Sequence, residues 1–228
     1  PSTCRPGAPV VRLAWFNAQG MTDHAPIIAW LEREAPLAVA FGELGPESAA
    51  VHRAVARLYP FRVNCHVRGR CPTMLYSRVA PLAGAPLASG DPQTRRALSA
   101  LRAELPLADG TALVAVHLSR PLPLGRQRAE LDELQLHLAS PANTVILGDF
   151  NATRRMHTLS AFAGRSGFSP APADRATWPR FLEGRSVPPL IQIDHVLAGR
   201  NLAVAALRAH DVGTSDHRAL VADLCRRN

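Results

Sequence analysis

The sequence contains no lysine, and all 26 of its basic residues are arginine. This absence excludes functions that need a primary amine at a defined place, such as a P-loop, a Schiff-base enzyme or a lysine nucleophile. Long apolar runs are also missing, since no stretch approaches the roughly 18 uncharged residues of a membrane-spanning helix. The four cysteines form no Cys-x-x-Cys pair, which argues against a zinc ribbon or a thioredoxin-like redox motif.

The composition is that of a globular chain. Its 228 residues are 47% hydrophobic and carry a net charge of +8. No internal repeat, low-complexity tract or long linker divides the chain, so we expect a single domain over residues 1–228. We also expect a monomer. The positive charge favours anionic partners such as phosphate esters, nucleic acids or lipid headgroups, but an arginine-rich composition explains the scattered arginines equally well.

Strand and helix patterns alternate along the chain. Strands are predicted over 10–17, 37–41, 62–67, 73–77, 98–105, 111–118, 144–147, 192–197, 202–208 and 219–224, and helices over 23–34, 47–58, 126–138 and 157–164. The segment 94–104 is open between strand and helix, and 185–189 has the composition of a surface loop. Because hairpins and strand–helix–strand units both occur, we predict an α/β four-layer sandwich, with two mixed β-sheets packed face to face and helices outside.

Polar residues that are costly to bury stand at the ends of these strands, where a sheet presents functional groups to a cleft. Singly, each is weak evidence, because such residues are common in turns and caps, and a lone histidine is more often a hydrogen-bonded core residue. Asp194 is an exception, since a carboxylate between Ile193 and Val196 needs a partner to be buried, and His217 is the best candidate. The full series is Asn17, Glu43, His117, Asp149, Asn151, Asp194, Asp216 and His217.

In order and spacing, this series resembles the endonuclease/exonuclease/phosphatase superfamily over almost the whole chain. The most specific motifs are Gly148-Asp149-Phe150-Asn151 after an apolar strand, Ser215-Asp216-His217 before the last strand, and Ile193-Asp194-His195 between them. The resemblance implies a metal-dependent hydrolase of a phosphodiester or phosphomonoester, acting on nucleic acid, lipid or a small phosphate ester. A catalytically silent domain that binds anions on the same scaffold is the alternative.

The resemblance also implies a cation site. Glu43 would bind Mg²⁺ or Mn²⁺, assisted by Asn17 and Asp216, because hard oxygen ligands suit these ions. The family usually has glutamine before this glutamate, whereas Gly42 stands here, which removes a side-chain hydrogen bond near the metal.

The same resemblance assigns the catalytic roles. His217, oriented and kept basic by Asp194, would take the proton from an attacking water. Asp149 and Asn151 would position that water or the phosphate. His117 would hydrogen-bond a phosphoryl oxygen. A carboxylate partner for His117 is not expected from the segment 71–78, because it contains no acidic residue.

Three residues are candidates for substrate binding. Arg154 and Arg155 follow the Asp149 motif and would hold an anionic substrate at the cleft rim, unless they are simply solvated. The third candidate is Trp178. The dipeptide Trp178-Pro179 resembles a motif in a bacterial subgroup of the superfamily, whose catalytic domain follows N-terminal membrane helices. Such a tether would explain the abrupt start at Pro1.

The cysteines can be tested against this fold. If Asn17 and His217 meet, the first and last strands are antiparallel neighbours, and Cys225 lies opposite about residue 9, close to Cys4. We therefore predict the disulfide Cys4–Cys225, and a second one, Cys65–Cys71, across a short turn. Two bridges favour an extracytoplasmic location at the periplasmic face of a membrane, whereas four unpaired thiols would fit a cytosolic protein.

Overall fold

A computed structural model of the chain describes residues 4–8, 10–65, 71, 73–87, 98–107, 110–122, 125–138, 141–171 and 175–228. Two sheets of six described strands each dominate it, in the orders β13-β14-β1-β2-β4-β3 and β5-β6-β7-β8-β12-β9. Both sheets are mixed, because β1 is parallel to β2 and β7 is parallel to β8 among otherwise antiparallel pairs.

The elements follow one another along the chain in this order: β1 (Val11–Asn17), α1 (Ala25–Glu34), β2 (Ala38–Gly42), η1 (Pro46–Ser48), α2 (Ala49–Leu58), β3 (Phe61–Asn64), β4 (Met74–Ser77), β5 (Ala83–Pro86), β6 (Ser99–Glu104), β7 (Ala112–His117), α3 (Arg126–Leu136), η2 (Pro141–Asn143), β8 (Thr144–Asp149), α4 (His157–Ser166), β9 (Ser169–Pro170), β10 (Phe181–Leu182), β11 (Arg185–Ser186), β12 (Asp194–Ala198), β13 (Leu202–His210) and β14 (Ala219–Arg226).

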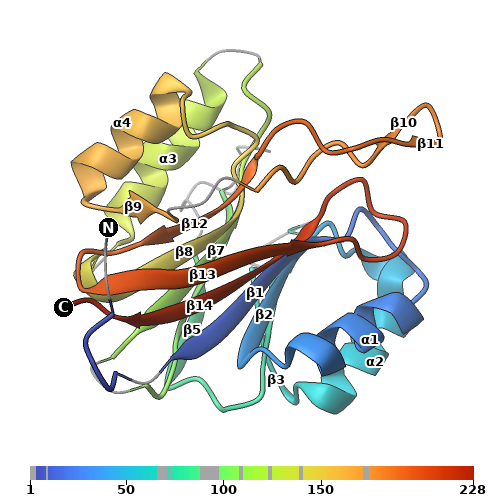
Figure 1. Ribbon diagram of the computed structural model, residues 1–228, viewed down its shortest axis with the longest axis horizontal. Helices are drawn as coiled ribbons and strands as arrows, with labels where there is room; N and C mark the ends of the chain where they lie inside the picture. The colour runs from blue at the N-terminus through green and yellow to red at the C-terminus, as the bar shows by residue number, and fades with distance from the viewer. Residues whose placement is uncertain are drawn as a thin grey trace.

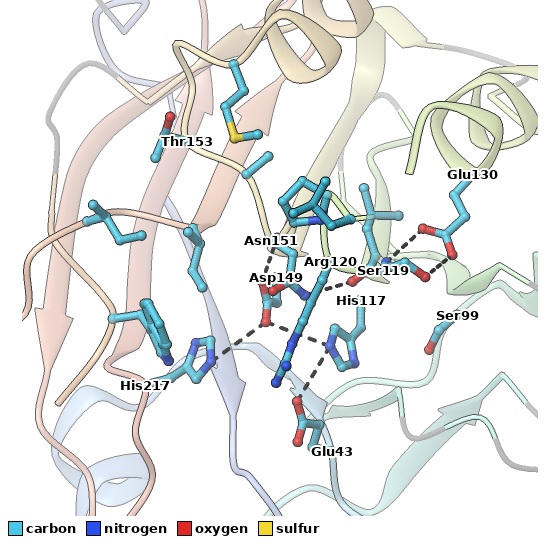
Figure 2. A pocket seen from close by; sticks show the side chains of 18 of the residues that line it. Glu43, Ser99, His117, Ser119, Arg120, Glu130, Asp149, Asn151, Thr153 and His217 are labelled. Carbon is cyan, nitrogen blue, oxygen red and sulfur yellow. Dashed lines mark hydrogen bonds and ion pairs between the residues drawn. The ribbon is translucent and has the colours of Figure 1, made fainter. Parts of the chain in front are cut away.

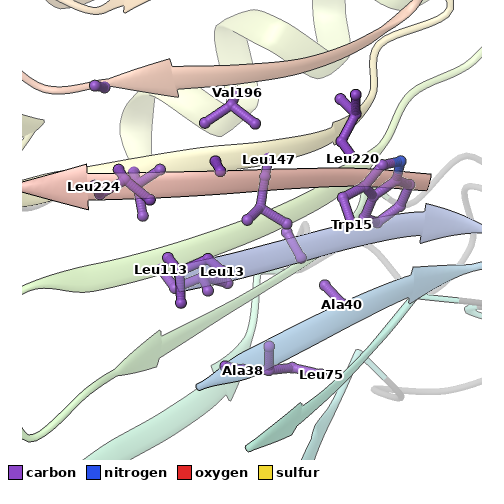
Figure 3. Close-up of a cluster of buried hydrophobic side chains, with 14 of the residues drawn as sticks. Leu13, Trp15, Ala38, Ala40, Leu75, Leu113, Leu147, Val196, Leu220 and Leu224 are labelled. Atoms are coloured by element: carbon purple, nitrogen blue, oxygen red, sulfur yellow. The ribbon is translucent and has the colours of Figure 1, made fainter. Parts of the chain in front are cut away.

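Three apolar cores separate four layers, as predicted. The central core lies between the sheets and joins residues such as Leu13 and Leu220 of one sheet to Leu113 and Leu147 of the other (Figure 3). A second core packs α1 and α2 onto the first sheet, and a third packs α3 and α4 onto the second (Figure 1). None of the described helices is long and apolar enough to span a bilayer.

The two-residue period of the strands sets the direction of the functional side chains. On β8, Val145 and Leu147 belong to the central core, so Asp149 at the strand end is directed to the same side of its sheet. The same period places three further polar side chains between the sheets, at the ends of β1, β7 and β12: Asn17, His117 and Asp194. A polar cluster therefore forms at one edge of the sandwich.

Both predicted disulfides are present, Cys4–Cys225 and Cys65–Cys71, each with a Cα–Cα distance of 5.6 Å. The first follows from the predicted antiparallel pairing of the first and last strands, in which Val11 lies opposite Leu224. Disulfides are typical of oxidising compartments.

Some elements differ from the prediction. The ambiguous segment 94–104 forms the strand β6 where it is described, while residues 94–97 lie outside the described residues. The loop assigned to 185–189 is wrong at its start, because Arg185–Ser186 pairs with Phe181–Leu182 in a hairpin that projects from the sandwich (Figure 1). The edge strand β5 was not predicted, since its residues Ala-Gly-Ala-Pro have neither alternation nor β-branched side chains.

Candidate active site

A pocket of about 980 Å³ opens at the edge of the sandwich where the polar cluster lies. Most of the predicted site residues line it: Glu43, His117, Asp149, Asn151, Trp178, Asp216 and His217 (Figure 2). Asn17 and Asp194 are fully buried beneath these residues and contact them directly. Arg154 and Arg155 are not among the lining residues, and the arginines in the wall are Arg120 and Arg126.

His217 is held by a buried carboxylate. Its Nδ1 lies 2.8 Å from Asp194 Oδ2, and Asp194 Oδ1 accepts a hydrogen bond of 2.7 Å from Trp15 Nε1. Desolvation would lower the pKa of His217, but the charges of Asp194, Asp149 and Asp216 outweigh it and raise this pKa to about 9. Desolvation would raise the pKa of Asp194, and the interaction with His217 outweighs it and keeps this pKa low.

Three potential metal ligands meet beside this pair. His117 Nε2 lies 3.6 Å from Glu43 Oε1 and 3.7 Å from Asp149 Oδ2, and the ligand atoms of these three residues lie within 4.8 Å of one another. Asn17 Nδ2 donates to Glu43 Oε1 at 2.9 Å and to Asp149 Oδ2 at 3.1 Å. Asn17 Oδ1 accepts the Gln19 N–H, so the amide supports the carboxylates here, and its predicted role as a ligand stays a prediction.

The electrostatics of this group fit a cation. Burial and the neighbouring charge of Asp194 raise the pKa of Asp149 to about 8. Desolvation lowers the pKa of His117, although Glu43 opposes this shift. Carboxylates this close attract a positive charge, which is supplied either by a proton or by a metal ion. Carboxylate oxygens are the ligands that suit Mg²⁺ and Mn²⁺, and a neutral imidazole is a ligand for transition-metal ions such as Mn²⁺ more than for Mg²⁺.

Asp216 precedes His217 in the chain and lines the same pocket. Its Oδ1 lies 3.8 Å from His217 Nε2, and its Oδ2 accepts a 3.0 Å hydrogen bond from Trp178 Nε1. Arg180 fixes the loop that leads into Asp216 and His217. Its Nη1 donates to the carbonyl oxygens of Val212, Gly213 and Ser215. Trp178 therefore lines the pocket and orients an acidic side chain.

The glycine before Glu43 has a steric explanation. A Cβ on Gly42 would lie 2.9 Å from Cη2 of Trp15, so the indole fills the space that a larger side chain would need. The next residue, Glu43, adopts a left-handed backbone with a φ of 55°. Such strained conformations are concentrated at functional sites. The sequence analysis did not predict the bond from Trp15 to Asp194, although Trp15 shares the strand face of Asn17.

Comparisons with known proteins agree with this geometry. The chain matches the Endonuclease/Exonuclease/phosphatase family over residues 14–217. No curated protein sequence matches it significantly. Among solved structures it is similar to TDP2 of D. rerio complexed with single strand DNA product, at 16% identity and a TM-score of 0.73, covering 94% of this chain and 98% of that one.

Two further structures show the range of relatives that share the fold. One is sphingomyelinase C from Streptomyces griseocarneus, with 13% identity, a TM-score of 0.65 and coverage of 94% of this chain and 99% of that chain. The other is a mannosyl-6-phosphatase from Bacteroides thetaiotaomicron, with 12% identity, a TM-score of 0.72 and the same coverage. At such identities the structures share the fold, and the family match extends through the motifs of the site. The chain belongs to the endonuclease/exonuclease/phosphatase family.

Proposed function

We propose that this chain is a divalent-cation-dependent phosphoesterase that hydrolyses a phosphodiester or phosphomonoester, with Mg²⁺ or Mn²⁺ as cofactor. The observation that supports this best is the continuous series of contacts from Asp194 through His217 to Asp149, His117 and Glu43. It combines an imidazole held by a carboxylate with a set of donors for a cation, which are the two requirements of water-mediated ester hydrolysis.

His217 is the general base in this proposal. Asp194 fixes its Nδ1, which leaves Nε2 within 3.8 Å of both Asp149 and Asp216 on the pocket side. When bound by Glu43, His117 and Asp149, a divalent cation would neutralise these carboxylates and the charge of a phosphoryl oxygen. Neutralising Asp149 removes one of the charges that raise the pKa of His217. This pKa then falls and the imidazole is neutral, so its Nε2 accepts the proton of the attacking water while Asp194 stabilises the imidazolium.

Asn151 has a positioning role. Its Nδ2 donates to the carbonyl oxygen of Leu118 at 2.8 Å, and its backbone N–H donates to Asp149 Oδ1 at 2.7 Å. These bonds connect the loops that follow β7 and β8, so the spacing of His117 and Asp149 is fixed before substrate arrives. Preorganised polar groups of this kind stabilise the charge that develops in a transition state.

The test is a hydrolysis screen with Mg²⁺, Mn²⁺ or chelator. Its substrates are bis(p-nitrophenyl) phosphate, plasmid DNA, sphingomyelin and inositol phosphates. We expect turnover that chelation abolishes, and a loss of at least about 100-fold in Asp149→Ala and His217→Ala, because both remove groups that act together. His24→Ala, an exposed histidine outside the pocket, is the matched control and should keep the wild-type rate.

Unchanged activity in Asp149→Ala or His217→Ala would contradict the proposal. Tight anion binding that is indifferent to chelator, with no turnover on any substrate, would favour the silent anion-binding domain instead.

We also propose an extracytoplasmic location, at the periplasmic face of a membrane. The two disulfides support it, because reducing compartments rarely maintain such bridges. Thiol alkylation of freshly lysed cells tests this, since cytosolic protein would carry four modified cysteines.

A further inference from the structure

The loop that follows β7 carries Arg120, which none of the sequence motifs contains. Its side chain lines the pocket and extends toward the space between His117 and His217 (Figure 2). Its guanidinium makes no hydrogen bond or ion pair with any residue in the described part of the chain, although Glu43, Asp149 and Asp216 line the same pocket. An arginine among carboxylates that pairs with none of them is available to an anionic ligand.

The backbone beside Arg120 is fixed from α3. Glu130, only 6% exposed, accepts hydrogen bonds from Ser119 N at 2.7 Å and from Ser119 Oγ at 2.5 Å. Gln127, 2% exposed, donates its Nε2 to the carbonyl oxygens of Ser119 at 2.9 Å and Phe150 at 2.8 Å. Burying a carboxylate is costly, so the two bonds of Glu130 hold the Ser119 backbone firmly, whereas the Arg120 side chain itself is exposed at the pocket. The arrangement fixes the backbone next to Arg120 relative to Phe150, the neighbour of Asp149.

We propose that Arg120 is a specificity-determining residue that binds the phosphoryl group of a phosphomonoester, so that the site prefers a dianionic monoester to a diester. This inference rests on the proposed function. The planar guanidinium donates two parallel N–H groups to two phosphate oxygens. A monoester has three non-bridging oxygens and a diester has two. With one oxygen at the cluster of Glu43, His117 and Asp149, only the monoester still offers two oxygens to Arg120.

The experiment compares kcat/KM for p-nitrophenyl phosphate and bis(p-nitrophenyl) phosphate in the full chain with a fixed concentration of Mn²⁺. We expect wild type to prefer the monoester. Arg120→Ala should lower kcat/KM for the monoester about 10- to 100-fold, the range for a lost charge-assisted hydrogen bond. The loss in kcat/KM for the diester should be smaller than this loss by a factor of at least about five. Arg120→Lys keeps the charge without the fork and should fall between.

Inorganic phosphate gives a second readout, because it offers the same oxygens without turnover. Its inhibition constant should rise in Arg120→Ala by a factor similar to the loss on the monoester. Arg200→Ala is the matched control. Arg200 is exposed in the turn between β12 and β13, which lies near the start of β8, whereas Asp149 lies at the end of β8. This variant should retain the wild-type values for both esters.

Three outcomes contradict the inference, and they differ in what they leave standing. An equal loss on both esters in Arg120→Ala, or a wild-type preference for the diester, would overturn the role of Arg120 and leave the proposed hydrolase intact. Failure of the wild type to hydrolyse either ester with any divalent cation would remove the proposed function, and the inference with it.

Discussion

The hydrogen bond from Trp15 to Asp194 supports the contact of Asp194 with His217 from inside the core. Trp15→Phe keeps an aromatic ring on β1 but removes the indole N–H, which donates to Asp194 Oδ1 at 2.7 Å between two fully buried side chains. Asp194 Oδ2 is already engaged by His217, so the substitution leaves one oxygen of a buried carboxylate without this donor. The expected cost is about 1–3 kcal/mol in the free energy of unfolding, plus the effect of the smaller ring.

The same change weakens the contact between Asp194 and His217. Trp15 is one of the donors that hold the pKa of Asp194 low, so its loss raises this pKa and leaves the carboxylate less firmly oriented toward His217 Nδ1. If the same 1–3 kcal/mol is lost in the transition state, kcat falls about 5- to 150-fold. KM should change little, because Trp15 does not line the pocket. The assay is steady-state hydrolysis of bis(p-nitrophenyl) phosphate, with the melting temperature measured in parallel.

Trp30→Phe is a matched control for the loss of ring volume. Trp30 is 1% exposed and packs edge-on against Phe16, but its Nε1 has no hydrogen-bond partner among the residues that the structure describes. This variant should lose stability without a comparable loss in kcat. A Trp15→Phe protein with wild-type kcat would refute the reasoning, as would a Trp30→Phe protein whose kcat falls equally.

Three other predictions concern the scaffold. Gly42→Ala should lower kcat, because the new Cβ would meet the Trp15 ring; an unchanged kcat would show that the ring moves freely. Alanine at both cysteines of Cys4–Cys225, which are 221 residues apart, should reduce the free energy of unfolding by about 5 kcal/mol. The same change at Cys65–Cys71, which are six residues apart, should reduce it by about 2 kcal/mol, because a shorter loop is closed. Equal losses in urea titrations would contradict this order. Burial would raise the pKa of Asp223, but two arginines outweigh burial and lower this pKa. The ionised carboxylate therefore stabilises the folded protein above about pH 4, and this contribution is lost as the pH falls through the folded-state pKa. Asp223→Asn should therefore flatten the acid limb of a stability–pH curve, and an unaltered slope would refute it.

Much of the fold could be predicted because strand periodicity and chain order carry it. Residues 10–17 are rich in β-forming side chains, and β1 with Asn17 at its end follows from them. The predicted meeting of Asn17 and His217, now 3.5 Å apart between Nδ2 and Nε2, led to the disulfide Cys4–Cys225. The hairpin β10–β11 was missed because each strand has only two residues, too short for any period to appear.

The site was predicted less completely, because roles that depend on partners distant in sequence have no local signal. Arg154 and Arg155 were favoured for their position beside the Asp149 motif, whereas Arg120 lines the pocket because α3 anchors the neighbouring Ser119. The contact of His117 with Glu43 was likewise not predicted, because Glu43 follows β2 of one sheet and His117 ends β7 of the other. Spatial neighbours of this kind become visible once both sheets are assembled.

The central claim is that a divalent cation binds to Glu43, His117 and Asp149 beside the imidazole of His217. Its most direct test is an anomalous difference map from a crystal of this chain soaked in Mn²⁺. We predict one strong peak in contact with side-chain oxygens of Glu43 and Asp149, which disappears in Glu43→Gln crystals soaked in the same way. A map without a peak at these residues, or with Mn²⁺ bound only elsewhere, would contradict the account.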